Sequence, residues 1–566
     1  MNFSNLFRKK PISKILQQGG DGEHSGLNKV LTVKDLTFFG IAAILGAGSF
    51  SSLGSAVFNG GPGVVFLFII VAIACAFTAF CYSEFASRIP VAGSAYTYAY
   101  SSFGELFAWI IGWALIMEYS IGNIYVAYSW SDYFTSLLQQ CGVDFPAYLS
   151  TSYMEASKAF HGNVQGEALT AWTTASEIGG LKIILDLPAL LINLIITYLV
   201  YRGVKESKNF SNLMVWIKMF VVGLIIIVGG ILIFKNDLFA NWTPDNSVGI
   251  PSFMPNGFSG VMMAVSGVFF AYIGFDAVSV MAEESKNPQR DLPRGMIYSL
   301  VICTIVYILL TLVLTGAANY KAFEGIGDPL AFIFEKENFD LPWMHFLVAI
   351  CAVVAMTSVM LVFQMGQPRI WMTMSRDGLM PKRFSKIHSK FKTPSYSTLV
   401  TGLVVGVPII FTDKTFVLDF TSIGTLFAFV LVCGGVLLIP RREKEAGKFH
   451  LPYVNAKFVF PALVAVAIFL ILTFVPGFFA ETFDFSGDKI AKNLPMVVFF
   501  VLIAVMLVLS VTKNLSLIPL LGLVSCCYLL TGMAVSNWMW FGVWLVIGLI
   551  FYFIYGYKNS KLNLKA

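Results

Sequence analysis

The chain has 566 residues, of which 57% are hydrophobic and only 12% are charged. Soluble globular proteins carry about 25% charged residues, so this composition excludes a set of soluble domains and indicates a membrane protein. The net charge is +6. The basic stretch at 376–392 is interpreted as a cytoplasmic loop beside anionic membrane lipid, and no nucleic-acid partner is expected.

Fourteen apolar runs are long enough to cross a hydrocarbon core of about 30 Å. They lie near 36–58, 62–87, 104–138, 180–201, 209–234, 257–282, 293–318, 343–375, 395–412, 415–439, 458–476, 494–512, 515–534 and 538–557. If residues 1–35 face the cytoplasm, the inward segments carry 28 of the 38 Lys and Arg residues and the outward segments carry 8. This asymmetry predicts an all-α, multi-pass protein of the cytoplasmic membrane with both termini inside. The first 30 residues are polar, so the first span is expected to direct insertion without a cleavable signal peptide.

The outward loop 235–256 divides the spans into two sets of five. The predicted parts are a cytoplasmic segment 1–35, a first repeat 36–234, a second repeat 257–439, four further spans 458–557 and a cytoplasmic tail 558–566. An odd number of spans inverts the second repeat relative to the first. We expect the last four spans to form a scaffold or an oligomer surface, with the oligomeric state left open, and the tail to be disordered.

The first span of each repeat is interrupted by glycine at its centre, at residues 44–49 and again at residues 270–276. A broken helix leaves backbone N–H and C=O groups that lipid cannot satisfy, so each break must face protein or a wet cavity. Paired breaks at corresponding positions indicate a secondary transporter with a substrate site near the membrane midplane.

The outward loop 139–179 is too long for a simple turn. Its stretches 147–158 and 168–178 are each predicted to form a short surface helix, and a loop of this length is more often functional or disordered than inert. Cys141 is the only cysteine in an outward segment, so no external disulfide is expected within the chain.

Enzyme motifs are missing from the sequence. All five histidines lie in loops or at a span edge, and there is no HExxH, CxxC, phosphate-binding glycine loop or GxSxG motif. Hydrolase, metalloenzyme and ATPase functions therefore lack their reacting groups, and we expect neither a metal nor a cofactor. Active transport without an ATP site must use an ion gradient.

Ionisable groups inside the spans are functional candidates, because a charge at mid-bilayer costs about 2.5–3.5 kcal/mol. They are Glu84, Glu118, Lys218, Asp276, Glu283, Glu284, Arg369 and Asp419. Those toward inner span ends, such as Glu84 beside Arg88, are interpreted as structural ion pairs. Asp419 is interpreted as a helix-start residue.

Three of these groups lie deeper. Lys218 is about nine residues into its span and is interpreted as a proton-coupling group, with a snorkelling lysine as the alternative. Glu118 could relay protons or pair with a basic residue. Asp276 follows the second break and could either accept free N–H groups at a helix start or set the potential of the site.

Several motifs together resemble one transporter family. They are GIAAILGAG at 40–48, YSEFASRIPVAGSAYTY at 82–98, GWALIMEY at 112–119, GFDAVS at 274–279, EESKNPQRDLP at 283–293, QPRI at 367–370, MSRDGL at 374–379 and SIGTLFA at 422–428. The chain resembles the cationic amino acid transporter family of the amino acid, polyamine and organocation superfamily. The resemblance covers about 35–560, includes the last four spans, and implies the inverted-repeat fold of the bacterial leucine transporter.

The resemblance also implies a substrate site at the two breaks. The substrate α-carboxylate would meet amides around Gly46, Ala47 and Gly48, and its ammonium would meet carbonyls near Ile44 on span 1. On span 6 the expected carbonyls belong to Phe270, Ala271 and Ile273, next to Gly274. The resemblance places Lys218 where sodium-driven relatives hold sodium, which favours proton coupling. Ser49 departs from the aliphatic residue that family members commonly carry there, so the side-chain selectivity stays open.

The expected function is import of cationic or small neutral amino acids by proton symport and alternating access. An exchanger or uniporter on the same fold is the first alternative, and an amino acid sensor is the second. Polyamine transport would require more acidic residues near the site.

Overall fold

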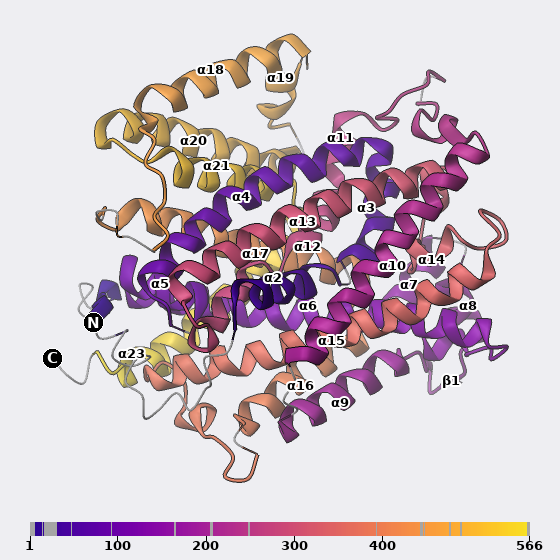
Figure 1. The fold of residues 1–566 in the computed structure, drawn as a ribbon, viewed down its shortest axis with the longest axis horizontal. Coiled ribbons are helices and arrows are strands. Elements are labelled where there is room, and N and C mark those ends of the chain that lie inside the picture. Colours follow the sequence, from indigo (N-terminus) through magenta and orange to yellow (C-terminus); the bar gives the residue numbers. More distant parts are fainter. Residues whose placement is uncertain are drawn as a thin grey trace.

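The structure is a computed structural model, and it consists almost entirely of helices (Figure 1). It describes residues 6–13, 15, 31–46, 48–91, 93–162, 166–203, 208–246, 249–391, 393–441, 445, 448–474, 477–486 and 489–562. The predicted all-α class is confirmed.

The helices up to residue 246 include both halves of the first broken span. They are α2 (Val33–Ile44), the π-helical turn η2 (Gly48–Ser52), α3 (Leu53–Gly60), α4 (Val64–Arg88), α5 (Ser94–Ser102), α6 (Glu105–Gln140), α7 (Tyr153–Gly162), α8 (Glu167–Thr174), α9 (Leu187–Arg202) and α10 (Lys208–Lys235). Two-residue strands β1 (Glu177–Ile178) and β2 (Leu181–Lys182) pair antiparallel.

The later helices contain the second broken span and the C-terminal group. They are α11 (Gly257–Met263), α12 (Val265–Tyr272), the 3₁₀ turn η6 (Asp276–Glu284), α13 (Pro288–Ala317), α14 (Pro329–Phe332), α15 (Pro342–Arg376), α16 (Ser395–Phe411), α17 (Lys414–Leu438), α18 (Ala456–Phe474), α19 (Phe478–Thr482), α20 (Lys489–Lys513), α21 (Leu517–Thr531), α22 (Val535–Phe551) and α23 (Tyr557–Asn559).

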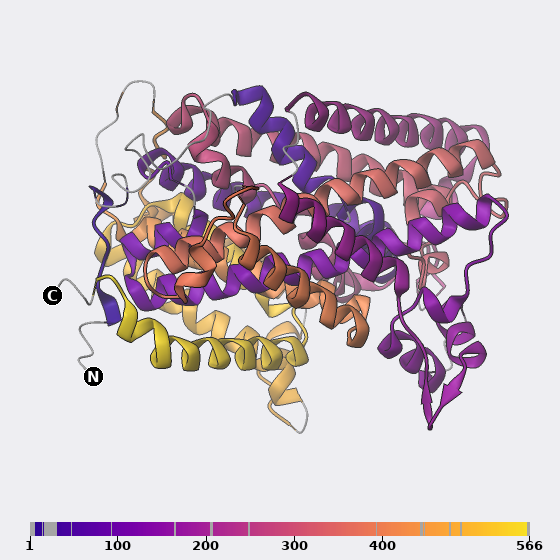
Figure 2. The ribbon, with the colours of Figure 1, turned by 90° about the horizontal axis from the view of Figure 1, so that it is seen from below.

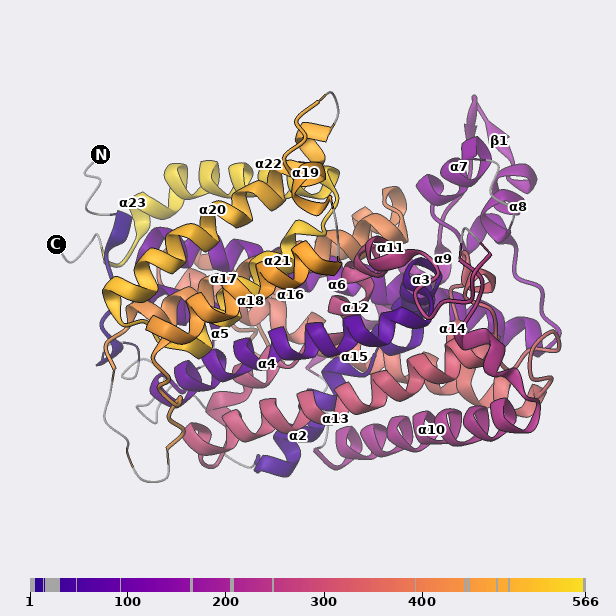
Figure 3. The same ribbon diagram turned by 90° about the horizontal axis from the view of Figure 1, so that it is seen from above.

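The long helices run side by side, so the molecule has two ends. Both termini lie at one end, which we call the terminal end, and α7, α8 and β1 lie at the opposite end, the loop end (Figures 1, 2 and 3). Within the described chain, nine helical stretches are long and apolar enough to cross a membrane, or ten if α11 and α12 count as one bent span. The apolar helices α9, α16 and α21 are shorter.

The predicted spans each contain a helix, but the fourth begins later than expected. Residues 180–186 form the end of the β-hairpin and a loop, and α9 starts only at Leu187. The Asp186 side chain accepts the backbone N–H of Ala189, and Pro188 occupies the first turn. The two short helices predicted in the preceding loop are present as α7 and α8, but α7 begins at Tyr153, six residues later than predicted, and α8 ends at Thr174.

The expectation of a disordered tail is wrong for residues 558–562. The Ser560 hydroxyl is buried and donates to Glu105 at 2.5 Å, and the Lys561 N–H donates to the Asp377 carbonyl at 3.0 Å. Residues 563–566 lie outside the described chain. Ser560 and Lys561 are ordered because they donate hydrogen bonds to Glu105 and to the Asp377 carbonyl at the terminal end of the bundle.

Candidate functional site

The two broken spans pack against each other at their breaks. α2 ends at Ile44, and α12 ends at Tyr272, followed by Gly274 with a φ of +117° that L side chains rarely adopt. A Cβ at Gly48 would lie 2.6 Å from the Ala271 Cα, and one at Gly274 would lie 2.9 Å from the Ala43 Cβ. Only glycine permits this approach of the two backbones.

The Tyr307 hydroxyl joins the two breaks. It lies 2.9 Å from the Ile44 carbonyl oxygen and 2.7 Å from the Ala271 carbonyl oxygen. Both carbonyls were expected to meet a substrate ammonium. Sequence reasoning missed Tyr307, because a tyrosine within the apolar α13 gives no local signal of what it reaches.

Two serine hydroxyls donate hydrogen bonds to backbone carbonyls at the first break. Ser49 Oγ donates to the Gly46 carbonyl at 3.0 Å, and Ser52 Oγ lies 2.7 Å from the Gly48 carbonyl and 2.9 Å from the Gly267 carbonyl. Ser49 is therefore at the break, as expected. Ala47 lies outside the described residues.

Lys218 is buried beside the first broken span. Its Nζ donates to Ser358 Oγ on α15 at 2.7 Å and lies 3.4 Å from the Ala42 carbonyl, two residues before α2 ends. The resemblance implied a position of Lys218 next to span 1, and this position is observed. The ammonium head contacts groups on α2 and α15. Its coupling role stays a prediction.

Glu118 and Asp276 lie buried near the second break. The backbone amides of Gly274, Asp276 and Ala277 are hydrogen-bond partners of the Asp276 carboxylate, but Asp276 is the first residue of η6 and does not cap it by a side-chain hydrogen bond. Thr425 is a side-chain partner of Glu118, while Glu118 Oε2 has no hydrogen-bond partner among the described residues. Glu118 is therefore tied to a hydroxyl on α17, and its relay role stays a prediction.

The other ionisable candidates are mostly structural. Arg88 Nε pairs with Glu84 Oε1 at 2.7 Å, as predicted. Asp419 is not the helix-start residue, because α17 begins at Lys414 and Asp413 caps it by accepting the Phe416 N–H. Asp419 instead accepts a hydrogen bond from Asn537 at 3.0 Å. Nothing is described of the Glu283 and Glu284 side chains.

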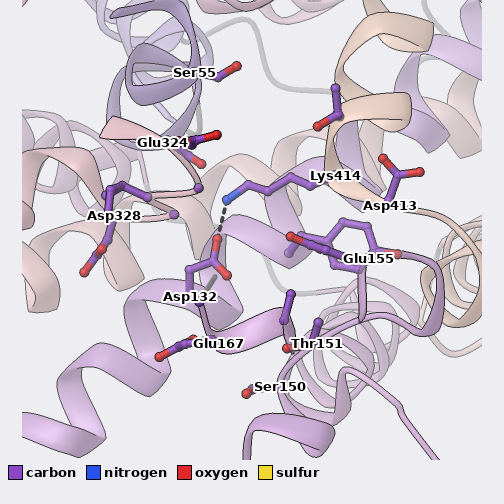
Figure 4. A pocket seen from close by; sticks show the side chains of 18 of the residues that line it. Ser55, Asp132, Ser150, Thr151, Glu155, Glu167, Glu324, Asp328, Asp413 and Lys414 are labelled. Atoms are coloured by element: carbon purple, nitrogen blue, oxygen red, sulfur yellow. Dashed lines mark hydrogen bonds and ion pairs between the residues drawn. The ribbon is translucent and has the colours of Figure 1, made fainter. Parts of the chain in front are cut away.

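A cavity of about 830 Å³ lies at the loop end, where residues of α7 and α8 line it. Figure 4 shows side chains that line this cavity. Its inner lining includes Ser51 of η2 and Tyr125 of α6. The Tyr125 ring packs edge-on against the ring of Phe270, with centroids 4.6 Å apart. This contact connects the cavity lining to α12, two residues before that helix ends.

The cavity is strongly acidic. Eight carboxylates and two lysines line it, namely Asp132, Glu155, Glu167, Asp186, Glu324, Asp328, Glu335 and Asp413 with Lys158 and Lys414. Burial raises the pKa of Glu155 and the pKa of Asp328 to about 7. The negative charge of the cavity therefore increases as the pH rises through neutrality.

An ion pair crosses this cavity. Lys414, at the start of α17, reaches to Asp132 on α6, while Asp413 and Glu155 lie nearby (Figure 4). Asp413 pairs with Lys158 of α7 at 2.7 Å. Neither pair follows from a sequence pattern, because the members of each pair are more than 250 residues apart.

At the terminal end the chain ends are packed into the bundle. Lys10 Nζ pairs with Asp377 Oδ1 at 2.7 Å, and the Tyr96 hydroxyl donates to the other Asp377 oxygen at 2.8 Å. Arg8 lies 3.6 Å from Glu105. The accessible cavity and the packed termini thus lie at opposite ends of the molecule.

Comparisons with known proteins identify relatives over nearly the full chain. A family model described as amino acid permease matches residues 31–505, and one for the C-terminus of such permeases matches residues 515–560. The branched-chain amino acid permease BcaP of Bacillus subtilis is 36% identical, with 99% of each chain covered. The methylthioribose transporter of Bacillus subtilis is 34% identical over 99% of this chain and 100% of the relative. The cationic amino acid transporter 3, mitochondrial, of Arabidopsis thaliana is 29% identical over 95% and 92%.

Proposed function

The chain belongs to the amino acid permease family of membrane transporters, and from this premise we propose that it imports an amino acid by proton symport. It is a multi-pass membrane transporter and not an enzyme. The observation that carries the proposal is the position of the buried Lys218 Nζ between Ala42 of the first broken span and Ser358 of α15.

The proposed substrate site is the pair of breaks. The backbone N–H groups of Gly46 and Gly48 suit the substrate α-carboxylate, which would replace the Ile44 carbonyl as the acceptor of the Gly46 N–H. The carbonyls of Ile44 and Ala271 suit the substrate ammonium. These carbonyls face the Tyr307 hydroxyl at 2.9 and 2.7 Å. In this scheme the ammonium takes the place of the tyrosine proton donor.

Proton coupling in the proposal runs through Lys218, with Glu118 as a helper. The ammonium form of Lys218 donates to Ala42 and holds α2 against α15, which keeps the first break in its substrate-binding geometry. Loss of the proton removes the charge that strengthens these hydrogen bonds and so loosens this contact, and substrate is released toward the terminal end. The proposed orientation places that end in the cytoplasm, in agreement with the positive-inside asymmetry.

Cationic or small neutral amino acids remain the proposed substrates. The acidic cavity supports the cationic class, since a cleft lined by one sign of charge concentrates ligands of the opposite sign. The names of the relatives add branched-chain amino acids and methylthioribose to the compounds that a test must include.

Uptake into proteoliposomes tests the proposal. The panel is labelled Arg, Lys, Ala, Leu and methylthioribose, each with an inward proton gradient and again with a protonophore. We expect gradient-driven accumulation of an amino acid that the protonophore abolishes. Uptake that requires a trans amino acid would support the exchanger, and accumulation of methylthioribose alone would overturn the amino acid assignment.

Lys218→Met is the decisive variant, because it keeps a long apolar stem and removes the ionisable head. We expect it to abolish accumulation and to retain equilibrium binding. Lys235→Met is the matched control, since Lys235 is exposed in the last turn of the same helix. If Lys218→Met accumulates substrate as well as wild type does, the coupling group lies elsewhere.

A further inference from the structure

Three potential metal ligands meet at the rim of the acidic cavity. They are the carboxylates of Asp328 and Glu335 and the imidazole of His345, and their ligand atoms all lie within 4.8 Å of one another. Asp328 precedes α14, Glu335 follows it, and His345 lies in the first turn of α15. The sequence predicted no metal, because these residues follow no short ligand motif and only the loop between α14 and α15 brings them together.

The backbone fixes the positions of this cluster. The Asp340 N–H donates to the Glu335 carbonyl at 2.9 Å, and the His345 N–H donates to the Leu341 carbonyl at 3.0 Å. Ser136 of α6 is a side-chain hydrogen-bond partner of Asp328. An orienting partner of this kind is typical of metal-binding side chains.

The separation of Glu335 and His345 is that of two ligands around a shared ion, and the Asp328 carboxylate lies within 4.8 Å of both. His345 Nε2 lies 3.8 Å from Glu335 Oε1, too far for a hydrogen bond. Two ligands that each lie about 2.0–2.2 Å from one ion are separated by about 3–4 Å. The Gln140 side chain lies 3.4 Å from the same imidazole nitrogen, and rotation of its amide would present an oxygen as a further ligand.

We propose that Asp328, Glu335 and His345 bind a divalent transition-metal ion and that Zn²⁺ fits the site best. One imidazole with two carboxylates is a borderline donor set, which suits zinc, whereas calcium and magnesium prefer oxygen ligands alone. The side chain of His345 is 14% exposed and that of Glu335 is 38% exposed, so an ion can enter from the cavity. This inference goes beyond the proposed transport function.

The site connects to the ion pair that crosses the cavity. A Cβ at Gly327 would lie 2.5 Å from Asp132 Oδ2, so the backbone beside Asp328 presses against the partner of Lys414. A bound ion ties this backbone to the start of α15 and to α6 through Ser136. It therefore stiffens the cavity rim, and we expect it to slow uptake.

Metal binding is measured on the purified full chain, stripped of metal, with Co²⁺ absorption as the direct readout and Zn²⁺ as the competitor. We expect one Zn²⁺ per chain, with affinity reduced at least about tenfold in His345→Gln and in Glu335→Gln. His161→Gln is the matched control, because His161 is an exposed histidine on α7 at the same end of the molecule. Its affinity should equal that of wild type.

Two results would overturn the proposal. One is the absence of Zn²⁺ binding to wild type at about 100 μM, and the other is unchanged affinity in both cluster variants. Glu335→Gln keeps the test valid if His345→Gln fails to fold. In proteoliposomes, Zn²⁺ should slow uptake by wild type and not by a folded cluster variant, and equal slowing of both would refute the effect on the rim.

Discussion

Tyr307 is the residue that most constrains how substrate enters the paired breaks. Its hydroxyl faces two buried carbonyls that come from opposite halves of the site, Ile44 and Ala271. A single hydroxyl proton satisfies these acceptors less well than an ammonium group with three donors would. Tyr307 therefore holds the two breaks together and competes with the substrate for the same oxygens.

Replacing Tyr307 with Phe should separate these two effects. The change removes the hydroxyl donor from the buried Ala271 carbonyl, while the Ile44 carbonyl still accepts the Gly46 N–H at 2.9 Å. A buried acceptor that loses its donor costs about 1–3 kcal/mol, so we expect a lower melting temperature for the substrate-free protein. Saturating amino acid should raise the melting temperature more in the variant than in wild type, because its ammonium restores the missing donor. Thermal unfolding in detergent, with and without substrate, measures both quantities.

Tyr298→Phe provides the control for this experiment. Tyr298 lies on the same helix with half of its surface exposed, so the same change should leave both melting temperatures near wild type. An equal substrate-induced shift in Tyr307→Phe and wild type would show that the ammonium does not meet these carbonyls.

At the scale of elements, the two breaks depend on backbone contact between α2–η2 and α12. Gly48→Val would place a branched side chain against the Ala271 backbone, where even a Cβ lies at 2.6 Å. The breaks must then separate, and we expect amino acid binding to vanish while the protein still inserts into the membrane. Equilibrium binding of labelled substrate to purified protein measures this loss.

The control for the glycine is Gly223→Val on α10, where an added Cβ meets nothing within 4 Å. This variant should bind substrate as wild type does. Wild-type affinity in a folded Gly48→Val protein would remove the paired breaks from consideration as the site.

The sequence was sufficient for features that are local. The glycine breaks, the buried position of Lys218 and the Glu84–Arg88 pair all follow from short patterns within one span. The late start of α9 was also readable, since an aspartate followed by Leu-Pro is a helix-start signal that the apolar run concealed. The sequence did not predict the contacts of Tyr307 and Ser358 or the ion pairs in the cavity, because each depends on a partner that is distant in the chain.

At the scale of the whole molecule, opposite ends differ in how firmly they are closed. The loop end carries the acidic cavity, whereas at the terminal end Lys10 pairs with Asp377 just beyond α15, and Lys561 and Ser560 add contacts from the other terminus. Alternating access requires these two ends to exchange roles. In the alternating-access scheme proposed above, the contacts of both termini would break in each transport cycle.

Removing the Lys10–Asp377 pair should favour the state that opens at the terminal end. The side chains of Lys10 and Asp377 are only 10% and 8% exposed, and loss of one partner from a buried pair costs about 3–5 kcal/mol. The Tyr96 hydroxyl still donates to Asp377 in Lys10→Met, so we expect the loss of stability in this variant to be smaller than that range. The variant should melt at a lower temperature than wild type. It should also bind substrate more weakly from the cavity side, because fewer molecules present the open cavity.

The control is Lys9→Met at the exposed neighbouring position, which should change neither the melting temperature nor the binding. Melting curves and equilibrium binding on the two variants decide the matter, and identical behaviour of both would mean that the chain ends pack against the bundle without controlling access.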